Sequence, residues 1–167
     1  GGFVGNFTSL LTNGKSRETL AHGVTILATG AKEYKPSAYL YGSHPAVVTH
    51  LEMDALLKDG DWRPSKTDNV VFIQCVGSRN EEHPYCSKVC CTHSIQNALE
   101  LKKRNPQIDV YILYRDIRTY GKREDLYKEA RNQGILFFRY DPAEKPEVSA
   151  NGNCVTVRFK DPILGCK

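Results

Sequence analysis

An alternation of strands and helices between residues 69 and 140 constrains the fold of this chain most strongly. Runs of apolar and β-branched residues predict strands over 69–74, 109–114 and 135–140. The segments between them, 87–104 and 123–132, carry apolar residues close to helical spacing. This order of elements is typical of a parallel sheet with crossover helices. The sequence therefore predicts an α/β fold, and sheets of this kind bind ligands beyond the carboxyl ends of their strands.

The residues before this alternation predict a β-rich segment. Asn13-Gly14 lies between apolar runs and indicates a hairpin turn. The apolar run 23–31 ends in the small residues Ala28-Thr29-Gly30-Ala31 and predicts a buried strand that leads into a tight loop. Small residues at such a position allow a ligand or another backbone to approach closely.

A polar connection separates the two parts. A short helix over 50–58, capped by Thr49, comes before it. Residues 59–65 are rich in Gly, Pro and polar residues, so we divide the chain into a first domain of 1–60 and a second of 61–167. Near the end of the second domain, a turn at 151–152 leads into a predicted strand over 154–159.

Composition excludes several classes of protein. The chain has 167 residues, of which 40% are hydrophobic and 25% charged, as in ordinary globular domains. No run approaches the roughly 18 apolar residues that span a bilayer. The formal charge of +4 is scattered, which disfavours nucleic acid as a partner. No signal peptide is visible, so we expect a cytoplasmic protein, and the single Met at position 53 suggests a piece of a longer chain.

Four of the six cysteines gather within 17 residues: Cys75, Cys86, Cys90 and Cys91. We expect Cys75 at the end of a strand and the other three at the start of the following helix, where the helix dipole favours an anionic centre. An iron–sulfur cluster fits this spacing, because its separated irons can take ligands from adjacent residues. Structural zinc, which favours Cys-x2-Cys pairs, and plain buried cysteines are the alternatives.

The other candidate residues have simpler interpretations. Cys154 and Cys166 suggest no site, although a disulfide between them is compatible with the sequence. His83 and His93 flank the four cysteines and could be ligands, but solvated or capping roles are the favoured interpretation. The basic segment 115–123 could dock a partner, and a solvated face is its simpler explanation. The glycines of a dinucleotide-binding loop are missing after the strand at 69–74, where Cys75 stands instead.

Three runs resemble the iron–sulfur flavoprotein subunit of heterodisulfide reductase and its relatives. They are 72–79 (FIQCVGSR), 85–92 (YCSKVCCT) and 111–121 (YILYRDIRTYG). Residues 30–36 and 161–165 also fit, so the resemblance covers nearly the whole chain. It implies a Rossmann-like lobe of the thioredoxin-reductase type, which carries the cysteines, and a partial β-rich segment of a flavin lobe.

The resemblance also implies a function. It implies an oxidoreductase subunit that relays electrons between FAD and a four-iron four-sulfur cluster, in a complex with other heterodisulfide reductase subunits and a hydrogenase or formate dehydrogenase. That complex reduces the mixed disulfide of coenzymes M and B in methanogens. The four cysteines, Cys75, Cys86, Cys90 and Cys91, would ligate the cluster nearest the flavin, and Thr29, Gly30 and Ala31 would lie against FAD.

Two departures from the family pattern limit these expectations. The chain lacks the Gly-x-Gly-x-x-Gly segment that grips the FAD pyrophosphate, and it lacks the Cys-x2-Cys-x2-Cys runs of the other clusters. We therefore expect a central fragment that binds FAD weakly or not at all and is inactive alone. The alternative function is a zinc-stabilised or cofactor-free, degenerate nucleotide-binding module that docks partner subunits.

Overall fold

The computed structural model describes residues 1–60 and 69–165. The chain divides into two compact units, Gly1–Glu33 and Tyr34–Lys167. Most of the connection over 59–65, where the sequence suggested a domain boundary, lies outside the described residues, as does Cys166.

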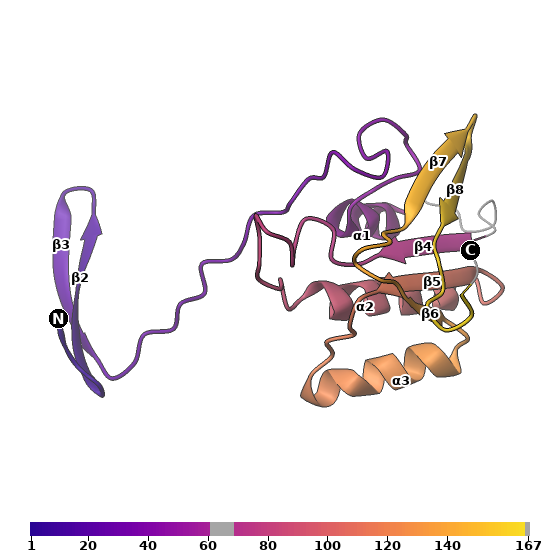
Figure 1. The fold of residues 1–167 in the computed structure, drawn as a ribbon. Coiled ribbons are helices and arrows are strands. Elements are labelled where there is room, and N and C mark those ends of the chain that lie inside the picture. The colour runs from indigo at the N-terminus through magenta and orange to yellow at the C-terminus, as the bar shows by residue number, and fades with distance from the viewer. Residues whose placement is uncertain (61–68, 166–167) are drawn as a thin grey trace. The chain divides into compact units, whose positions relative to one another are not determined.

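The first unit is a small antiparallel sheet (Figure 1). The hairpin expected at Asn13-Gly14 is confirmed, because Asn13 pairs with Ser16 across a two-residue turn. Gly14 has a φ of 56°, a conformation that glycine adopts readily in such turns. The strands are β1 Gly2–Phe3, β2 Asn6–Asn13 and β3 Ser16–His22.

The prediction of a buried strand over 23–31 is wrong. Residues 24–36 form neither helix nor strand, and the side chains of Val24, Ile26 and Leu27 are 70%, 83% and 86% exposed. None of the described strands pairs with this run, so its backbone has no ladder and its side chains have no core. Strand propensity reflects packing against neighbours, and apolar residues without neighbours do not form a strand.

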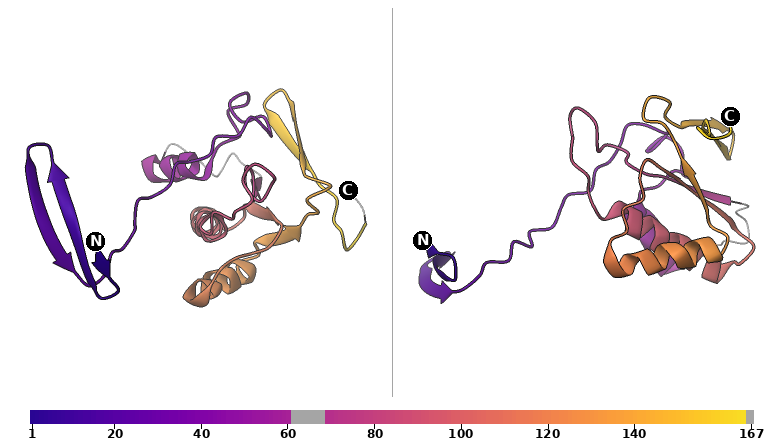
Figure 2. Two further views of the ribbon diagram at one scale, coloured as in Figure 1. Left: turned by 60° about the vertical axis from the view of Figure 1, so that its left-hand side comes forward. Right: turned by 60° about the horizontal axis from the view of Figure 1, so that its bottom comes forward.

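The second unit contains the predicted parallel sheet. β4 pairs with β5 and β5 with β6, all in parallel, so the expected α/β fold is confirmed. Figure 2 shows the three helices as one layer on one face of this sheet. The strands are β4 Asn69–Ile73, β5 Asp109–Tyr114 and β6 Leu136–Arg139; the helices are α1 His50–Asp59, α2 Cys90–Arg104 and α3 Glu124–Asn132, with a 3₁₀ turn at Gly121–Arg123 before α3.

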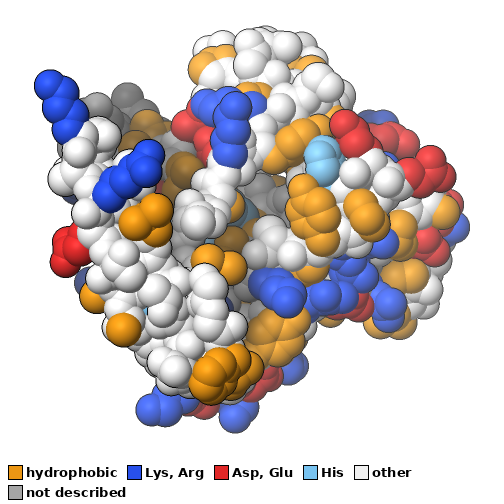
Figure 3. All heavy atoms as spheres, turned by 90° about the vertical axis from the view of Figure 1, so that its left-hand side faces the viewer, with side chains coloured by type: hydrophobic (Ala, Val, Ile, Leu, Met, Phe, Trp, Pro, Cys, Tyr) orange, Lys and Arg blue, Asp and Glu red, His pale blue; other side chains and the backbone are white. Residues whose placement is uncertain are grey.

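The main core lies between the helices and the sheet. Ile95 and Leu101 of α2 and Ile112 of β5 have no exposed surface, and they cluster with Met53 of α1 and Ala130 of α3. This apolar layer holds α2 against the sheet and so fixes the position of its first residues in space. Large hydrophobic side chains that remain exposed occur at separate places on the face in Figure 3, where they are orange.

The opposite face of the sheet carries aromatic contacts. Tyr111 of β5 stacks on Phe138 of β6 with ring centroids 6.4 Å apart, and Phe138 contacts Phe159 at 5.2 Å. Phe159 follows a second hairpin, made of β7 Glu147–Asn151 and β8 Cys154–Arg158. The sequence predicted β8 and the turn at 151–152 but not β7, whose polar and small residues give only a weak strand signal.

Helix α2 begins at Cys90, three residues later than predicted. Lys88 has a φ of 62°, a left-handed conformation that an α-helix cannot include. Apolar spacing alone does not reveal such a residue, so the predicted helix was too long at its start. No helix in the described parts of the chain has the length and apolar character needed to cross a membrane.

Helix α1 begins with the predicted cap. A carboxylate of this cap makes the free energy of unfolding depend on pH. The backbone N–H of Thr49 donates to the Glu52 carboxylate at 2.8 Å, and the Tyr41 hydroxyl donates to it at 2.7 Å. These bonds, that from Thr49 first, lower the pKa of Glu52 from 4.5 to about 2. A lowered folded-state pKa contributes stability above the unfolded pKa, and this stability is lost as the pH falls toward the folded value.

We therefore expect the free energy of unfolding of the wild type to fall between pH 4.5 and about 2 in part through Glu52. In Glu52→Gln this contribution disappears, so the slope over that window becomes shallower. Urea unfolding at a series of pH values measures it. Glu18→Gln, which removes an exposed carboxylate of β3, is the control and should keep the wild-type slope. Equal slopes in wild type and Glu52→Gln would contradict the expectation.

Candidate functional site

The clustered cysteines lie beyond the carboxyl ends of the parallel strands, where the loop from β4 to α2 runs (Figure 1). Cys75 comes two residues after β4, and Cys90 and Cys91 are the first two residues of α2. Cys86 lies in the loop between them. β4 and α2 thus present three of the four thiols at the ligand-binding end of the sheet.

The Cys91 Sγ donates a hydrogen bond to the backbone oxygen of Asp116 at 3.6 Å. The neighbouring Cys91 side chain lowers the pKa of Cys90 to about 6, with help from the Ser87 side chain and backbone N–H groups at the start of α2. The Cys90 side chain in turn raises the pKa of Cys91, which is buried. Helix N-termini stabilise thiolates in this way because their first N–H groups have no partner within the helix.

Cys75 belongs to the same electrostatic environment. Its thiol is half-buried, burial raises its pKa, and the neighbouring Cys90 raises it further. Cys91 also feels the charge of Cys75. The sulfur of Cys86, in the loop before α2, accepts the N–H of Lys88 at 3.3 Å. In the described parts of the chain, no three His, Cys, Asp or Glu side chains are arranged to hold a metal ion.

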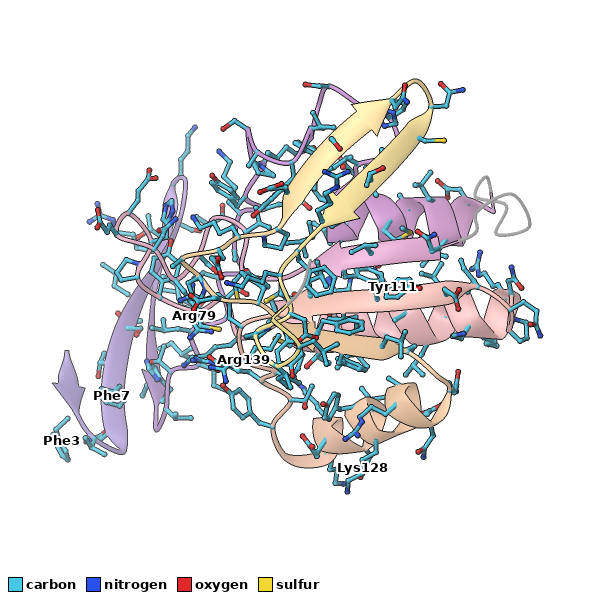
Figure 4. The ribbon with its side chains drawn as sticks, turned by 45° about the vertical axis from the view of Figure 1, so that its right-hand side comes forward. Phe3, Phe7, Arg79, Tyr111, Lys128 and Arg139 are labelled. Carbon is cyan, nitrogen blue, oxygen red and sulfur yellow. The ribbon has the colours of Figure 1, made fainter. Side chains whose placement is uncertain are left out.

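Two arginines adjoin the Cys75 thiol. The Arg79 guanidinium lowers the pKa of Cys75, against the effect of burial, and forms an ion pair with Asp116, with 2.7 Å between Nη2 and Oδ2. Arg115 donates from Nη1 to the backbone oxygen of Arg79 at 2.8 Å. The Arg79 guanidinium lowers the pKa of Asp116. Figure 4 shows Arg79 and Arg139 at this end of the sheet, and Arg139 also acts on Asp116.

Several buried polar atoms around the thiols lack hydrogen-bond partners. Gln74 is 1% exposed, and both polar atoms of its side chain find no partner among the described residues. The same holds for Nη1 of Arg79, Oγ1 of Thr92 and Nε of Arg115. Such atoms are rare in folded proteins and indicate a place where a ligand or water binds. Donors on residues next to Cys75 and Cys91 in the chain suit an anionic group, as an iron–sulfur cluster is.

The backbone of the cysteine loop is unusual. Cys75, Arg79 and Lys88 have φ values of 63°, 58° and 62°, where side chains other than glycine are disfavoured. Gly77, at 70°, lies against the ring of Tyr34, and a Cβ at this position would collide with that ring. Left-handed non-glycine residues cluster at functional sites, where surrounding structure holds them in place.

The residues expected to contact FAD belong to the first unit. Thr29, Gly30 and Ala31 form part of the exposed irregular segment that follows β3. A Cβ added to Gly30 would meet no atom of the described residues within 4 Å. The contact of these residues with a flavin stays a prediction.

The two histidines beside the cysteines contact other side chains. His93 Nε2 lies 2.7 Å from Oδ2 of Asp54 and links α2 to α1. His83 lies between the rings of Tyr34 and Tyr85, with centroids 5.9 and 5.8 Å away, and its Nδ1 is buried without a partner among the described residues. Neither histidine therefore has the solvated or capping role that the sequence favoured.

Two residues of the predicted basic segment, 115–123, contact residues of the candidate site. Arg118 lies 3.6 Å from Asp116, and Arg115 holds the cysteine loop through Arg79. The sequence reasoning missed Arg79, Gln74 and Asp116 as parts of the site. For two of them, closeness to Cys75 in the sequence was a usable signal. Gln74 precedes Cys75 directly, and Arg79 follows it by four residues.

No protein-family model matches the chain. Among curated proteins, it is 40% identical over 159 residues to a component of the "H(2)/formate:CoB-CoM heterodisulfide,ferredoxin reductase" of Methanococcus maripaludis. It is 40% identical over 162 residues to a component of the "H(2):CoB-CoM heterodisulfide,ferredoxin reductase" of Methanothermobacter marburgensis. It is 37% identical over 159 residues to the iron-sulfur component of the "CoB--CoM heterodisulfide reductase" of Methanocaldococcus jannaschii.

Each of these matches covers 86% of this chain but only 24% of the relative. The chain thus spans about a quarter of the length of the curated relatives it matches. The resemblance seen in the cysteine runs is confirmed: the chain is homologous to a segment of the iron–sulfur component of heterodisulfide reductase, which is an oxidoreductase.

Proposed function

We propose that this chain holds a four-iron four-sulfur cluster through Cys75, Cys86, Cys90 and Cys91 and relays electrons in an iron–sulfur flavoprotein oxidoreductase. The observation that carries the proposal is the placement of Cys75 just after β4 and of Cys90 and Cys91 at the start of α2, with unpartnered buried polar atoms on neighbouring residues. The name of the Methanocaldococcus jannaschii relative, which calls it an iron-sulfur component of the reductase, supports the proposal.

The positive charge around the thiols and the spacing of the thiols both suit an iron–sulfur cluster. A cluster with four thiolate ligands is anionic, and the start of α2 offers N–H groups together with the positive end of the helix dipole. Arg79 and Arg115 add positive charge next to Cys75. The irons of a cubane are spread apart, so its ligands need not converge on the point that a single ion requires. Adjacent residues such as Cys90 and Cys91 can then both serve as ligands.

The protein has three tasks in this proposal. Helix α2, fixed by its buried apolar face, holds Cys90 and Cys91 in place. The loop from β4 to α2 brings Cys75 and Cys86 to the same end of the sheet. Burial and hydrogen bonds to sulfur set the affinity for electrons. A bound cluster supplies one-electron transfer, and the residues of this chain supply its ligands and its electrostatic surroundings.

We assign flavin binding and the reduction of a substrate to longer proteins like the relatives, in which this chain matches one segment. There, FAD would exchange electrons with this cluster, and Thr29, Gly30 and Ala31 would contact the flavin once further chain covers them. Partner subunits and a hydrogenase or formate dehydrogenase would complete the path, since the relatives' names pair hydrogen or formate with the CoB-CoM heterodisulfide. The substrate of the complex would be that heterodisulfide.

Anaerobic reconstitution tests the proposal. With ferrous iron and sulfide, the 167-residue chain should develop the broad absorbance near about 400 nm that thiolate-bound iron–sulfur centres show. Cys90→Ser should lose most of this absorbance, because one of the four proposed ligands is removed. Cys154→Ser is the matched control, since Cys154 is an exposed free thiol of β8, and it should keep the wild-type spectrum.

Metal and sulfide analysis of the same samples decides between the alternatives. Iron and sulfide in equal amounts support the cluster. One zinc ion per chain in place of iron would favour the zinc-stabilised module. An absorbance that survives Cys90→Ser unchanged would contradict the assignment of Cys90 as a ligand.

A further inference from the structure

The loop from β5 to α3, residues 115–123, is held to the lobe in its first half. Asp116 forms ion pairs with Arg118 of the same loop, at 3.6 Å, and with Arg79, at 2.7 Å. Ile117 packs against the hydrophobic core. Because ion pairs and an apolar contact hold these residues, the loop leaves β5 along a defined path.

The second half of the loop is fixed at both of its ends. The Thr119 side chain is buried, and its hydroxyl donates to the Glu124 carboxylate at 2.9 Å. Between these two residues, the N–H of Arg123 donates to the Tyr120 carbonyl oxygen at 3.2 Å, where the 3₁₀ turn begins. The residues 120–123 therefore form a turn that the lobe presents to solvent.

The side chains on this turn are cationic and aromatic. Lys122 and Arg123 are exposed, and in the described parts of the chain neither has an ion pair or a side-chain hydrogen bond. Tyr120 between the loop anchor and these cations is 56% exposed. Arg139, at the end of β6, is exposed as well, and it lines a surface pocket of about 390 Å³ together with Glu124, the residue after the turn. Three cations without internal partners and one aromatic ring thus belong to one region of the surface.

The segment around the turn carries most of the net charge of the chain. Residues 115–139 contain seven Lys and Arg residues and four Asp and Glu residues, so their net charge is +3 out of the chain's +4. A region of one sign attracts partners of the opposite sign and speeds their encounter. The four carboxylates in the same segment disfavour a nucleic acid, whose partners carry denser positive charge.

We propose that the turn 120–123, together with Arg139, docks an acidic peptide segment of a partner protein. Lys122, Arg123 and Arg139 pair with Asp and Glu side chains of that segment, and the Tyr120 ring packs on its apolar atoms. Tyrosine and arginine are enriched in protein interfaces, where a ring supplies contact area and cations supply specificity. This surface goes beyond the proposed function, because it needs no bound cluster.

Nuclear magnetic resonance of the ¹⁵N-labelled chain tests the proposal, with a synthetic peptide in which Glu alternates with Leu and Ala as the probe. Addition of the peptide should shift the amide signals of 120–123 and 139. Residues 102–104 at the end of α2 give an internal comparison, since they are three consecutive cations, two of which pair with Glu100. Their signals should stay in place. Equal shifts at both positions would show diffuse attraction between charges and overturn the proposal.

Matched variants separate the turn from net charge. Lys122→Gln/Arg123→Gln should raise the Kd of the peptide about fivefold, because two exposed ion pairs are lost. Lys102→Gln/Lys103→Gln removes the same charge and should leave the Kd unchanged. Tyr120→Ala should raise the Kd about fivefold, as the loss of an aromatic interface residue does. Phe3→Ala removes a ring that is 69% exposed in β1, and it should have no effect.

Two further outcomes would also contradict the proposal. One is an absence of any shift with the peptide. The other is a single-stranded oligonucleotide that shifts the signals of 120–123 at lower concentration than the peptide does at equal ionic strength. The titration uses the chain without iron or sulfide, so its failure leaves the assignment of the cysteines as cluster ligands untouched. Failure of the reconstitution would equally leave the docking surface untouched.

Discussion

Replacing Gly77 by alanine is expected to lower the free energy of unfolding by about 2–4 kcal/mol. Two effects add at this position. Gly77 has a φ of 70°, which costs a residue with a Cβ about 1–2 kcal/mol. The new Cβ also collides with the ring of Tyr34, so either the ring or the loop must move. Urea unfolding followed by circular dichroism measures the loss.

Gly134→Ala separates the two effects. Gly134 has a φ of 79°, but a Cβ there would meet no atom within 4 Å. This variant should therefore show only the conformational part, about 1–2 kcal/mol. In the Gly77→Ala background, Tyr34→Ala should recover part of the stability, because it removes the collision. Equal losses in Gly77→Ala and Gly134→Ala would show that Tyr34 does not crowd Gly77.

Replacing Leu101 by alanine is expected to lower the free energy of unfolding by about 2–5 kcal/mol. Leu101 of α2 has no exposed surface and belongs to the core between the helices and the sheet. Its truncation loses apolar burial and leaves a cavity, and both terms destabilise. Because α2 also places Cys90 and Cys91, the loss should reduce cluster retention at raised temperature before the chain unfolds globally.

Leu51→Ala gives the matched comparison for Leu101→Ala. Leu51 lies in α1, and its side chain is 55% exposed. Its truncation should change the free energy of unfolding by about 0.5 kcal/mol or less. A loss in Leu101→Ala no larger than that in Leu51→Ala would mean that the apolar layer under α2 does not stabilise the lobe.

The parallel lobe was predictable because its signals are local and agree with one another. The strand at 109–114 was predicted with its observed bounds, and Thr49 caps α1 as expected. The run 23–31 shows the opposite case. Its composition is that of a buried strand, but burial depends on neighbours that the described residues do not supply. Propensity is a property of a segment, and burial is a property of its surroundings.

The candidate site was predictable in position but not in composition. Cysteine spacing located it at the end of β4 and the start of α2, where three thiols are found. The pair of Arg79 and Asp116 joins residues 37 positions apart, as the numbers in the sequence show, and no local pattern reveals that contact. The left-handed conformation of Lys88 is equally hidden, because lysine has no preference for it.

The spatial order of the parallel sheet, β4-β5-β6, is also its order along the chain. Each new strand can therefore join an edge that already exists as the polypeptide is synthesised, and contacts of short sequence separation favour rapid folding. Cys75, Cys90 and Cys91 all precede β5, and Asp116 follows it by two residues. Synthesis of the chain thus completes every residue of the candidate thiol site before it reaches β6, the last strand of the parallel sheet.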